Sequence, residues 1–321
     1  MEQLPRAREH ALAGCGGSPD APSVLRRLDH VILAVEDLDA AATAYARLLG
    51  RSPSWRGEHP GAGTANALFR VENSYLELLT PLGAGPIGAA VRSWLAARGE
   101  GPLGLAFGTD DAAACQRFLA ERGLDPGPIE KGMGRDVESG AFREWLRVPI
   151  PLARTRGVPI FAIEQRSPEA LLPIVPPIGD AAAAVHALDH AVVRSPDPDA
   201  ARTLYGDALG LRLALDREFP QWGMRLLFFR VGGVTVEVAS ALAGSSPPAS
   251  DAAPETAGDR LWGLSWRVRD ADAARARLAA AGFDASEVRP GRRPGTRVLG
   301  VHGGTCGVPT LLLEPESRGR I

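Results

Sequence analysis

Two pairs of side chains that could bind a metal or move a proton occur at one spacing in this sequence. His30 is followed by Glu77 after 47 positions, and His190 is followed by Glu237 after the same number. Imidazole and carboxylate groups act as proton donors and acceptors and as metal ligands. The second pair follows the first at an offset of 160 residues, which predicts two copies of one structural unit with the same chemical groups.

Further matches at the same offset support this duplication. The matched segments are Leu28-Asp29-His30 with Leu188-Asp189-His190, Leu49-Gly50 with Leu209-Gly210, and Phe69-Arg70-Val71 with Phe229-Arg230-Val231. The two copies run from histidine to glutamate without a net insertion, so both halves are expected to fold alike.

Hydrophobic patterning predicts two βαβββ units in each half. The strand at 24–35 alternates, with His30 on one face and Asp29 on the other, so Asp29 and Asp189 are expected to be structural. Helix 39–49 follows, with Asp37 as its N-cap and Gly50 as its end, and then come a turn-rich segment at 51–64 and strands at 67–71 and 74–80. The other expected strands are 103–108, 128–131, 141–148, 158–165, 188–194, 224–231, 234–239, 261–269, 286–289, 297–302 and 309–314, with helices at 110–122, 271–281 and from Asp197-Pro198 to Gly206 or Gly210.

Composition divides the chain into four parts. We expect a disordered tail at 1–23, a first domain of two units at 24–166, a Pro- and Ala-rich linker at 167–186, and a second domain of two units at 187–316. Within the second domain, the Ser/Pro/Ala/Gly-rich segment 240–260 is expected to be a mobile linker.

Composition and charge also exclude several classes of partner. The 321 residues are 45% hydrophobic and 23% charged, as is usual for a soluble globular protein. The net charge of −2 and the scattered basic residues argue against nucleic acid, and no apolar run reaches the roughly 18 residues that cross a membrane. Three cysteines without a CxxC motif and an N-terminus without an apolar signal core predict free thiols and a cytoplasmic location.

Six segments carry a family resemblance: LDHVILAV (28–35), GEHPGAGTANALFR (57–70), YLELL (75–79), LDHAVV (188–193), LFFRVGGVTVEVA (227–239) and VPTLLLEP (308–315). They resemble the vicinal oxygen chelate superfamily, also called the glyoxalase/bleomycin-resistance/extradiol-dioxygenase fold, and the first half is similar to the glyoxalase-like subgroup with an HPGxGT signature. The resemblance covers nearly all of residues 24–316. It implies an α+β protein in which four βαβββ modules pair into two domains with cupped mixed sheets.

The resemblance also implies a metal site in each domain. Family ligands come from the first and last strands of each module. The ligand sets carried over are His30, Glu77 and Glu164 in the first domain, and His190, Glu237 and Glu314 in the second. The fourth family position falls near Gly104 and Gly263, which cannot ligate. One imidazole and two carboxylates would leave open positions on Fe, Mn, Ni or Zn, and such an ion would polarise a small oxygenated substrate while Glu77 or Glu237 acts as base.

The implied function is a metal-dependent isomerase, lyase or dioxygenase, although the two-histidine iron triad of ring-cleaving relatives is incomplete here. A non-catalytic protein that binds an antibiotic or aromatic ligand is the main alternative, and a metal-free isomerase with Glu77 or Glu237 as base is a third. The glutamates could also pair simply with Arg70 and Arg230. His59 is expected to shape the mouth of a pocket. Trp222 and Trp266 are expected to line the cups. The sequence leaves open which domain is active and whether the protein is a monomer or a homodimer.

Overall fold

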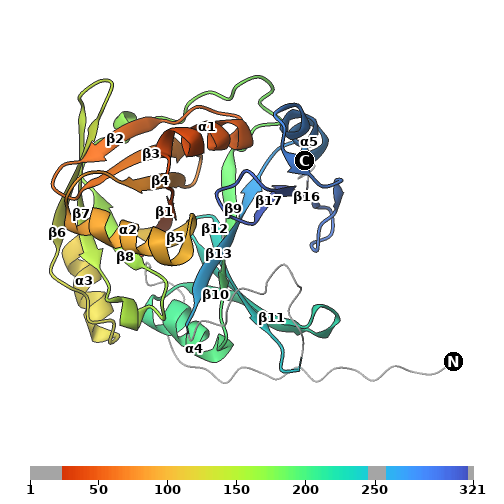
Figure 1. Cartoon of the computed structure of the whole chain (residues 1–321). Helices are drawn as coiled ribbons and strands as arrows, with labels where there is room; N and C mark the ends of the chain where they lie inside the picture. The colour runs from red at the N-terminus through yellow and green to blue at the C-terminus, as the bar shows by residue number, and fades with distance from the viewer. Residues whose placement is uncertain (1–23, 245–257, 317–321) are drawn as a thin grey trace, which may run out of the picture.

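The computed structural model describes residues 24–244 and 258–316 and contains two mixed β-sheets. Figure 1 shows the sheet of the first half, domain 1, on the left, and that of the second half, domain 2, beside and below it. The prediction of an α+β protein with two mixed-sheet domains of paired βαβββ modules is confirmed.

Domain 1 consists of two units joined by a helix. The first unit contains β1 (Arg27–Ala34), α1 (Leu38–Leu49), β2 (Trp55–His59), β3 (Thr64–Arg70) and β4 (Tyr75–Pro81). Helix α2 (Pro86–Arg98) then leads to β5 (Gly101–Gly108), α3 (Ala112–Glu121), β6 (Glu130–Asp136), β7 (Phe142–Pro149) and β8 (Ile160–Gln165), with short 3-10 turns at η1 (Leu152–Arg154) and η2 (Glu169–Leu171).

Helix α1 begins and ends where the sequence predicts. The Asp37 side chain accepts hydrogen bonds from the backbone N–H groups of Asp39 and Ala40, and Gly50 ends the helix in the left-handed conformation with φ 69°. Helix α2 was not expected, because its apolar stripe consists mainly of Val91 and Leu95. These two side chains pack on the inner face of β1 and β4 and so cover one side of domain 1.

The sheet of domain 1 closes into a barrel in the order β1-β4-β3-β2-β6-β7-β8-β5. Closure depends on β2, which pairs with β6 through Gly57 opposite Asp136 and Glu58 opposite Arg135. The interpretation of 51–64 as turns is therefore wrong for β2. Only the part around Pro60 forms a turn, and the strand before it is too short and too polar to show a clear alternation.

Domain 2 repeats the plan with an open sheet. Its first unit contains β9 (Ala187–Arg194), α4 (Pro198–Arg202) continuing into the π-helical turn η3 (Thr203–Ala208), β10 (Arg212–Phe219), the 3-10 turn η4 (Pro220–Trp222), β11 (Met224–Val231) and β12 (Val234–Ala241). Its second unit contains β13 (Arg260–Arg267), α5 (Ala271–Ala280), β14 (Asp284–Ala285), β15 (Arg289–Pro290), β16 (Arg297–His302) and β17 (Thr310–Glu314). The strand order is β10-β11-β12-β9-β13-β17-β16-β14, so β10 and β14 lie at the two edges of this sheet.

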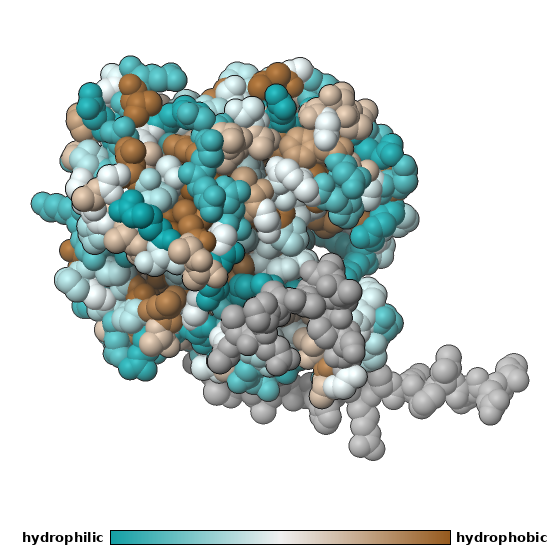
Figure 2. Space-filling view, in the orientation of Figure 1, coloured by the Kyte–Doolittle hydropathy of each residue, from teal (hydrophilic) through white to brown (hydrophobic). Residues whose placement is uncertain are grey.

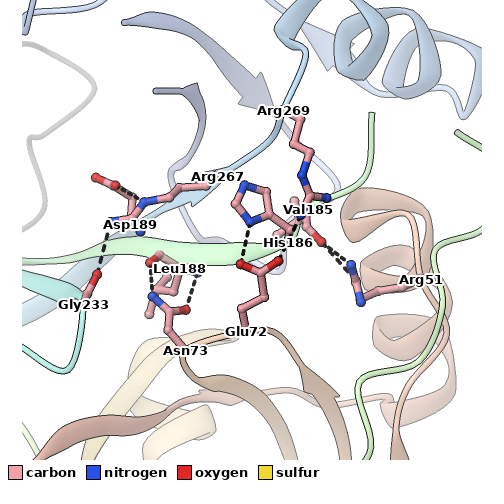
Figure 3. A network of polar contacts seen from close by, with 10 residues as sticks. All are labelled: Arg51, Glu72, Asn73, Val185, His186, Leu188, Asp189, Gly233, Arg267 and Arg269. Atoms are coloured by element: carbon pink, nitrogen blue, oxygen red, sulfur yellow. Dashed lines mark hydrogen bonds and ion pairs between the residues drawn. The ribbon is translucent and has the colours of Figure 1, made fainter. Parts of the chain in front are cut away.

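The turn between β3 and β4 docks domain 1 onto the first strand of domain 2 (Figure 3). The Asn73 side chain donates to the backbone oxygen of Leu188 at 2.9 Å and accepts from its N–H at 3.0 Å. The Glu72 carboxylate binds His186 and Arg269, each at 3.1 Å. Strand β9 is therefore held by domain 1 immediately before its histidine.

Two contacts of helix α1 join the domains as well. Arg277 on α5 donates to the carbonyl oxygens of Arg47 and Leu48 at the C-terminal end of α1, where a cation is favourable. The Tyr45 hydroxyl on α1 donates to the backbone oxygen of Thr305 at 3.0 Å. One continuous cluster of buried apolar side chains includes residues of both domains. The two sheets thus share a single core.

Three predicted segments need separate mention. The predicted tail at 1–23 and most of the predicted mobile linker at 240–260 lie outside the described residues, and the ends of that linker belong to β12 and β13. Residues 167–186 connect the sheets and pack on domain 1, where Arg51 donates to the carbonyl oxygens of Val175 and Val185.

The surface shown in Figure 2 is largely hydrophilic, and small apolar groups on it are separated by polar side chains. Among the residues that the structure covers, no helix is both long and apolar enough to span a membrane.

Candidate active site

A β-bulge on β1 brings an aspartate beside the first histidine. Leu28 pairs with Phe107 and His30 pairs with the next residue of β5, Ala106, so that Asp29 is an extra residue on β1. A bulge breaks the alternation of a strand and redirects a side chain. Asp29 Oδ1 accepts a hydrogen bond from His30 Nδ1 at 2.9 Å.

Strand β9 contains the same bulge. Asp189 is the extra residue, because Leu188 and His190 pair with the consecutive residues Trp266 and Ser265. Asp189 Oδ2 accepts from His190 Nδ1 at 2.8 Å. The expectation that Asp29 and its counterpart point away from the histidines is therefore wrong, since it assumed an unbroken strand.

The predicted histidine–glutamate pairs do form. The first strand and the fourth strand of each domain are parallel neighbours, which brings the two side chains onto one face. His30 Nε2 lies 3.5 Å from Glu77 Oε2, and His190 Nε2 lies 3.3 Å from Glu237 Oε2. Each imidazole thus lies between two carboxylates, one on each ring nitrogen, and this arrangement can hold and move a proton.

In domain 1 the pair belongs to a longer polar chain. Asn66 Nδ2 donates to Glu77 Oε1 at 2.7 Å and also lies 3.1 Å from His59 Nε2. His59 Nδ1 lies 2.8 Å from Thr64 Oγ1. Burial lowers the pKa of His59, so a neutral ring with its proton on Nδ1 satisfies both contacts. His59 is half-buried at the end of β2 and joins the glutamate network, whereas the sequence suggested a residue at a pocket mouth.

Domain 1 supplies its own positive charge to these acids. Gln165 Nε2 donates to Asp29 Oδ1 at 3.1 Å, and Arg143 Nη2 donates to Gln165 Oε1 at 3.3 Å. Arg143 is only 7% exposed, and its guanidinium is always charged. The His30 ring stacks on Tyr75 at a centroid distance of 4.5 Å. Asp29 and Glu77 thus belong to a hydrogen-bonded network inside the barrel, and Arg27 Nε lies 3.3 Å from Asp29 Oδ2.

In domain 2 the pair is more accessible. The side chains of His190 and Glu237 are 19% and 13% exposed, against 4% and 10% for His30 and Glu77. Burial alone would lower the pKa of His190, but the hydrogen bond to Asp189 and the charge of Glu237 raise it above its ordinary value. The imidazole is therefore cationic over a wider pH range than a free histidine.

Asp189 is held in its charged form. Burial by itself would raise its pKa, but the hydrogen bond and charge of His190, together with Arg267, lower it to about 2. Arg267 on β13 donates through Nε to Asp189 and through Nη2 to the backbone oxygen of Gly233 at 3.1 Å. The groups that hold the His190 ring in place, Asp189, Arg267 and the Gly233 carbonyl, thus come from two neighbouring strands and a turn.

An apolar area adjoins the pair in domain 2. Phe228 pairs in register with Glu237, which pairs with Val192 on its other side, so these three side chains share a face. They belong to a cluster formed by Val192, Met224, Leu226, Ala239, Phe219, Phe228 and Trp262. The open sheet therefore presents a polar pair beside an apolar and aromatic surface.

The remaining predicted ligands, Glu164 and Glu314, lie elsewhere. Glu164 Oε2 accepts from the N–H of Ala112 at the start of α3, and Glu314 Oε2 accepts from the N–H of Ala271 at the start of α5, both at 2.8 Å. Both glutamates face the helix layer, where a carboxylate at a helix N-terminus is stabilising. This corrects the predicted ligand sets, because neither glutamate forms a three-ligand group with the histidine and first glutamate of its domain in residues 24–244 and 258–316.

The two tryptophans predicted to line the cups differ in position. Trp266 is 1% exposed and lies in the shared core, on the opposite face of β13, so its assignment to a pocket is wrong. Trp222 is 37% exposed on η4, where it stacks on Phe219 at 4.6 Å. It lies next to the apolar cluster of domain 2.

The protein's own residues do not fit a divalent metal of the predicted kind. Each pair offers one imidazole and one carboxylate, whereas a catalytic zinc uses three protein ligands and the iron facial triad also uses three. Within residues 24–244 and 258–316, no three His, Cys, Asp or Glu side chains are grouped so that they could hold an ion. The reorientation of Glu164 and Glu314 removes the third ligand from each set.

Comparison with known families agrees with the duplicated fold. Residues 28–183 match the model of a glyoxalase-like domain, and residues 189–299 match that of the glyoxalase/bleomycin resistance protein/dioxygenase superfamily. The chain belongs to the vicinal oxygen chelate superfamily. Both halves of this superfamily member thus carry the family's module pair.

Individual relatives of this superfamily member cover different parts of it. A stretch of 62 residues is 39% identical to ethylmalonyl-CoA/methylmalonyl-CoA epimerase from Cereibacter sphaeroides, and this match covers 19% of our chain and 46% of that protein, less than half its length. A mutant 4-hydroxymandelate synthase from Streptomyces coelicolor superposes with a TM-score of 0.62 at 16% identity, covering 90% of our chain and 92% of its own. A fusion of a xylose isomerase-like TIM barrel with 4-hydroxyphenylpyruvate dioxygenase gives 0.58 at 13% identity, covering 95% and 51%. These structural likenesses show the fold alone.

Proposed function

We propose that the protein is an isomerase-type enzyme that moves a proton on a small oxygenated carbon acid, and that domain 2 carries the reaction. The observation behind this proposal is the accessible pair in domain 2, in which His190 lies 3.3 Å from Glu237 and hydrogen-bonds to Asp189, two contacts that raise its pKa. The equivalent pair in domain 1 is enclosed by the barrel network and has a structural role in this proposal.

The proposed reaction uses two groups. Glu237 takes the proton from a substrate carbon next to a carbonyl group, and the electron pair of the broken C–H bond moves onto the carbonyl oxygen. The Nε2–H group of cationic His190 stabilises that oxygen as negative charge develops on it. Glu237 then returns the proton to another carbon, or to the other face of the same carbon after the planar enolate has turned over in the site, which gives the isomer without an oxidant or reductant.

The partial match to an epimerase supports proton transfer as the reaction class. The first test is deuterium incorporation into methylmalonyl-CoA, and then into small 2-oxo acids, with the full chain in D₂O and proton NMR as readout. Glu237→Gln should reduce the rate by a factor of about 100 or more, because a positioned general base contributes on the order of 10²–10⁴. Glu77→Gln is the matched control and should stay within about twofold of the wild type by the same reasoning.

Two results would contradict the proposal. One is the absence of exchange above the protein-free rate for every compound. The other is loss of exchange in Glu77→Gln but not in Glu237→Gln, which would place the reaction in domain 1.

The metal-dependent enzyme implied by the family resemblance is tested on the same samples. We expect exchange to survive dialysis against a chelator, because the ligand set provides two protein groups where three are needed. About one equivalent of Fe, Mn, Ni or Zn that is lost in His190→Ala and whose return restores exchange would establish the metalloenzyme instead.

A non-catalytic binding protein is the second candidate. It is favoured by the aromatic side chains Phe228, Trp262 and Phe219 that pack in the apolar cluster beside the pair. This candidate predicts binding of an aromatic compound that is unaffected by Glu237→Gln and is accompanied by no deuterium exchange. Binding that weakens in Glu237→Gln together with a loss of exchange would reject it.

A further inference from the structure

A row of polar side chains crosses the sheet of domain 2 at the level of His190. The strand register aligns Arg212 on β10, Arg230 on β11, Thr235 on β12, His190 on β9 and Ser265 on β13. Directly opposite residues on neighbouring strands share a face of the sheet. We call these five residues the cationic row.

The two arginines of the row have no negative partner within the sheet. Arg212 and Arg230 are both exposed and directly opposite each other, an arrangement that is destabilising for like charges. Across the described part of the chain, neither arginine forms an ion pair with a carboxylate, and Arg230 donates only to the hydroxyl of Thr235. The matched Arg70 of domain 1 differs, because it pairs with Glu169 at 3.3 Å.

Ser265 at the inner end of the row has an unused hydroxyl. Its neighbours on β13, Leu264 and Trp266, point into the shared core, so Ser265 faces the other side of the sheet, next to His190. Ser265 is 1% exposed, and its Oγ has no hydrogen-bond partner among the described residues. A buried hydroxyl without a partner is costly, so this group is available to a ligand that lies along the row.

The charges around the row also favour an anion. Although burial and the charge of Arg230 act to lower the pKa of His190, the hydrogen bond to Asp189 and the charge of Glu237 raise it, and the charge of Asp189 behind the ring is matched by Arg267. Within residues 24–244 and 258–316, Glu237 is the one carboxylate that contacts the far nitrogen, Nε2, of the His190 ring in this row. Next to the row, Phe228 and Val192 begin the apolar cluster.

We infer that the cationic row binds the carboxylate or phosphate of a small organic acid, whose apolar body lies over Phe228 and Val192. Arg230 is the principal contact, Ser265 donates its hydroxyl, and the carbon to be deprotonated then lies beside Glu237. The inference rests on the proposed function for the role of Glu237 but not for the binding of the anion. It names the substrate class of that site, an anionic carbon acid with an apolar group.

The test compares phenylacetate with its neutral analogue phenylacetamide by calorimetry and by the NMR shift of the His190 ring. Phenylacetate should bind at least about tenfold more tightly, since charge-assisted hydrogen bonds are about twice as strong as neutral ones. Arg230→Met should abolish this preference, and Arg212→Met should reduce it. Arg70→Met is the matched control and should leave the preference intact.

Equal binding of the two compounds, no binding of phenylacetate, or an unchanged preference in Arg230→Met would each overturn the inference. Circular dichroism of each variant separates loss of fold from loss of the contact, and Arg212→Met gives a second reading if Arg230→Met does not fold. Because binding is measured without turnover, a preference for phenylacetate together with no deuterium exchange would reject the proposed reaction and leave the anion site standing.

Discussion

Replacing Asn73 by alanine tests whether domain 1 holds the site of domain 2 in shape. The Asn73 amide occupies both backbone groups of Leu188, with distances of 2.9 and 3.0 Å (Figure 3). Leu188 is 1% exposed and directly precedes Asp189, the bulge residue that braces His190. The substitution therefore removes the support of the bulge without touching either member of the proton-transfer pair.

The size of the effect follows from the two lost contacts. A hydrogen bond contributes roughly 1 kcal/mol net, and a buried backbone group left without a partner costs about 1–3 kcal/mol. We therefore expect Asn73→Ala to lower the free energy of unfolding by about 2–4 kcal/mol. A looser bulge also weakens the hydrogen bond from His190 to Asp189, so the pKa of His190 should fall toward its ordinary value.

Urea denaturation gives the free energy of unfolding, and an NMR titration of the His190 ring gives its pKa. Glu72→Gln is a suitable control, because it changes the neighbouring contact to His186 and Arg269 but keeps the Asn73 amide. It should cost less than about 1 kcal/mol, as is typical of an exposed ion pair. If Asn73→Ala proved as stable as the wild type and left the pKa of His190 unchanged, the positioning of the site by domain 1 would be refuted.

Three further predictions concern individual side chains. The pKa of Asp189 is about 2 in the folded protein and 3.8 ordinarily, so its charge stabilises the fold above about pH 4. Asp189→Asn should therefore lower the free energy of unfolding by roughly 2 kcal/mol at neutral pH. In acid denaturation curves, this difference between the variant and the wild type should vanish between about pH 4 and 2. Glu314→Ala should lower the free energy of unfolding by about 1 kcal/mol in thermal denaturation, because the N–H of Ala271 at the start of α5 loses its acceptor. A loss of deuterium exchange in this variant would argue that Glu314 belongs to the site after all. Trp266→Ala should lower the free energy of unfolding by about 3–5 kcal/mol or prevent folding, because this side chain is buried. Trp222→Ala should change the free energy of unfolding by less than about 1 kcal/mol, because that side chain is exposed. Similar losses of stability in the two variants would contradict their assigned positions.

The duplicated units and their histidine–glutamate pairs could be predicted because they depend on spacing and alternation, which survive in the sequence. The positions of Asp29 and Asp189 could not, because one extra residue in a strand leaves no mark on its hydrophobic pattern. The same limit applies to Glu164. A strand that ends beside a helix start shows the same alternation whether its last carboxylate faces inward or caps the helix.

The polar interior of domain 1 was hidden for a different reason. Asn66 lies within an apolar strand, whose hydrophobic pattern gives no sign of a site, although a lone amide in such a strand must find partners when buried. Gln165, which contacts Asp29, and Arg143, which contacts Gln165, come from strands far along the chain, so these contacts depend on the strand order of the closed sheet. That order depends on two pairings between β2 and β6, which the local pattern does not encode.

The shared core described above has a consequence for how the two copies can diverge. Although the sequence records two equivalent halves, buried apolar side chains from Leu25 to Leu312 form one cluster that passes through both domains. Neither half can then lose its packing without exposing apolar surface of the other, so the unit that folds and is selected is the pair. Under this constraint domain 1 keeps an enclosed polar network, while domain 2 keeps an accessible face. In each domain, residues can be substituted without disturbing the shared core only on the side of the sheet that the core does not contact.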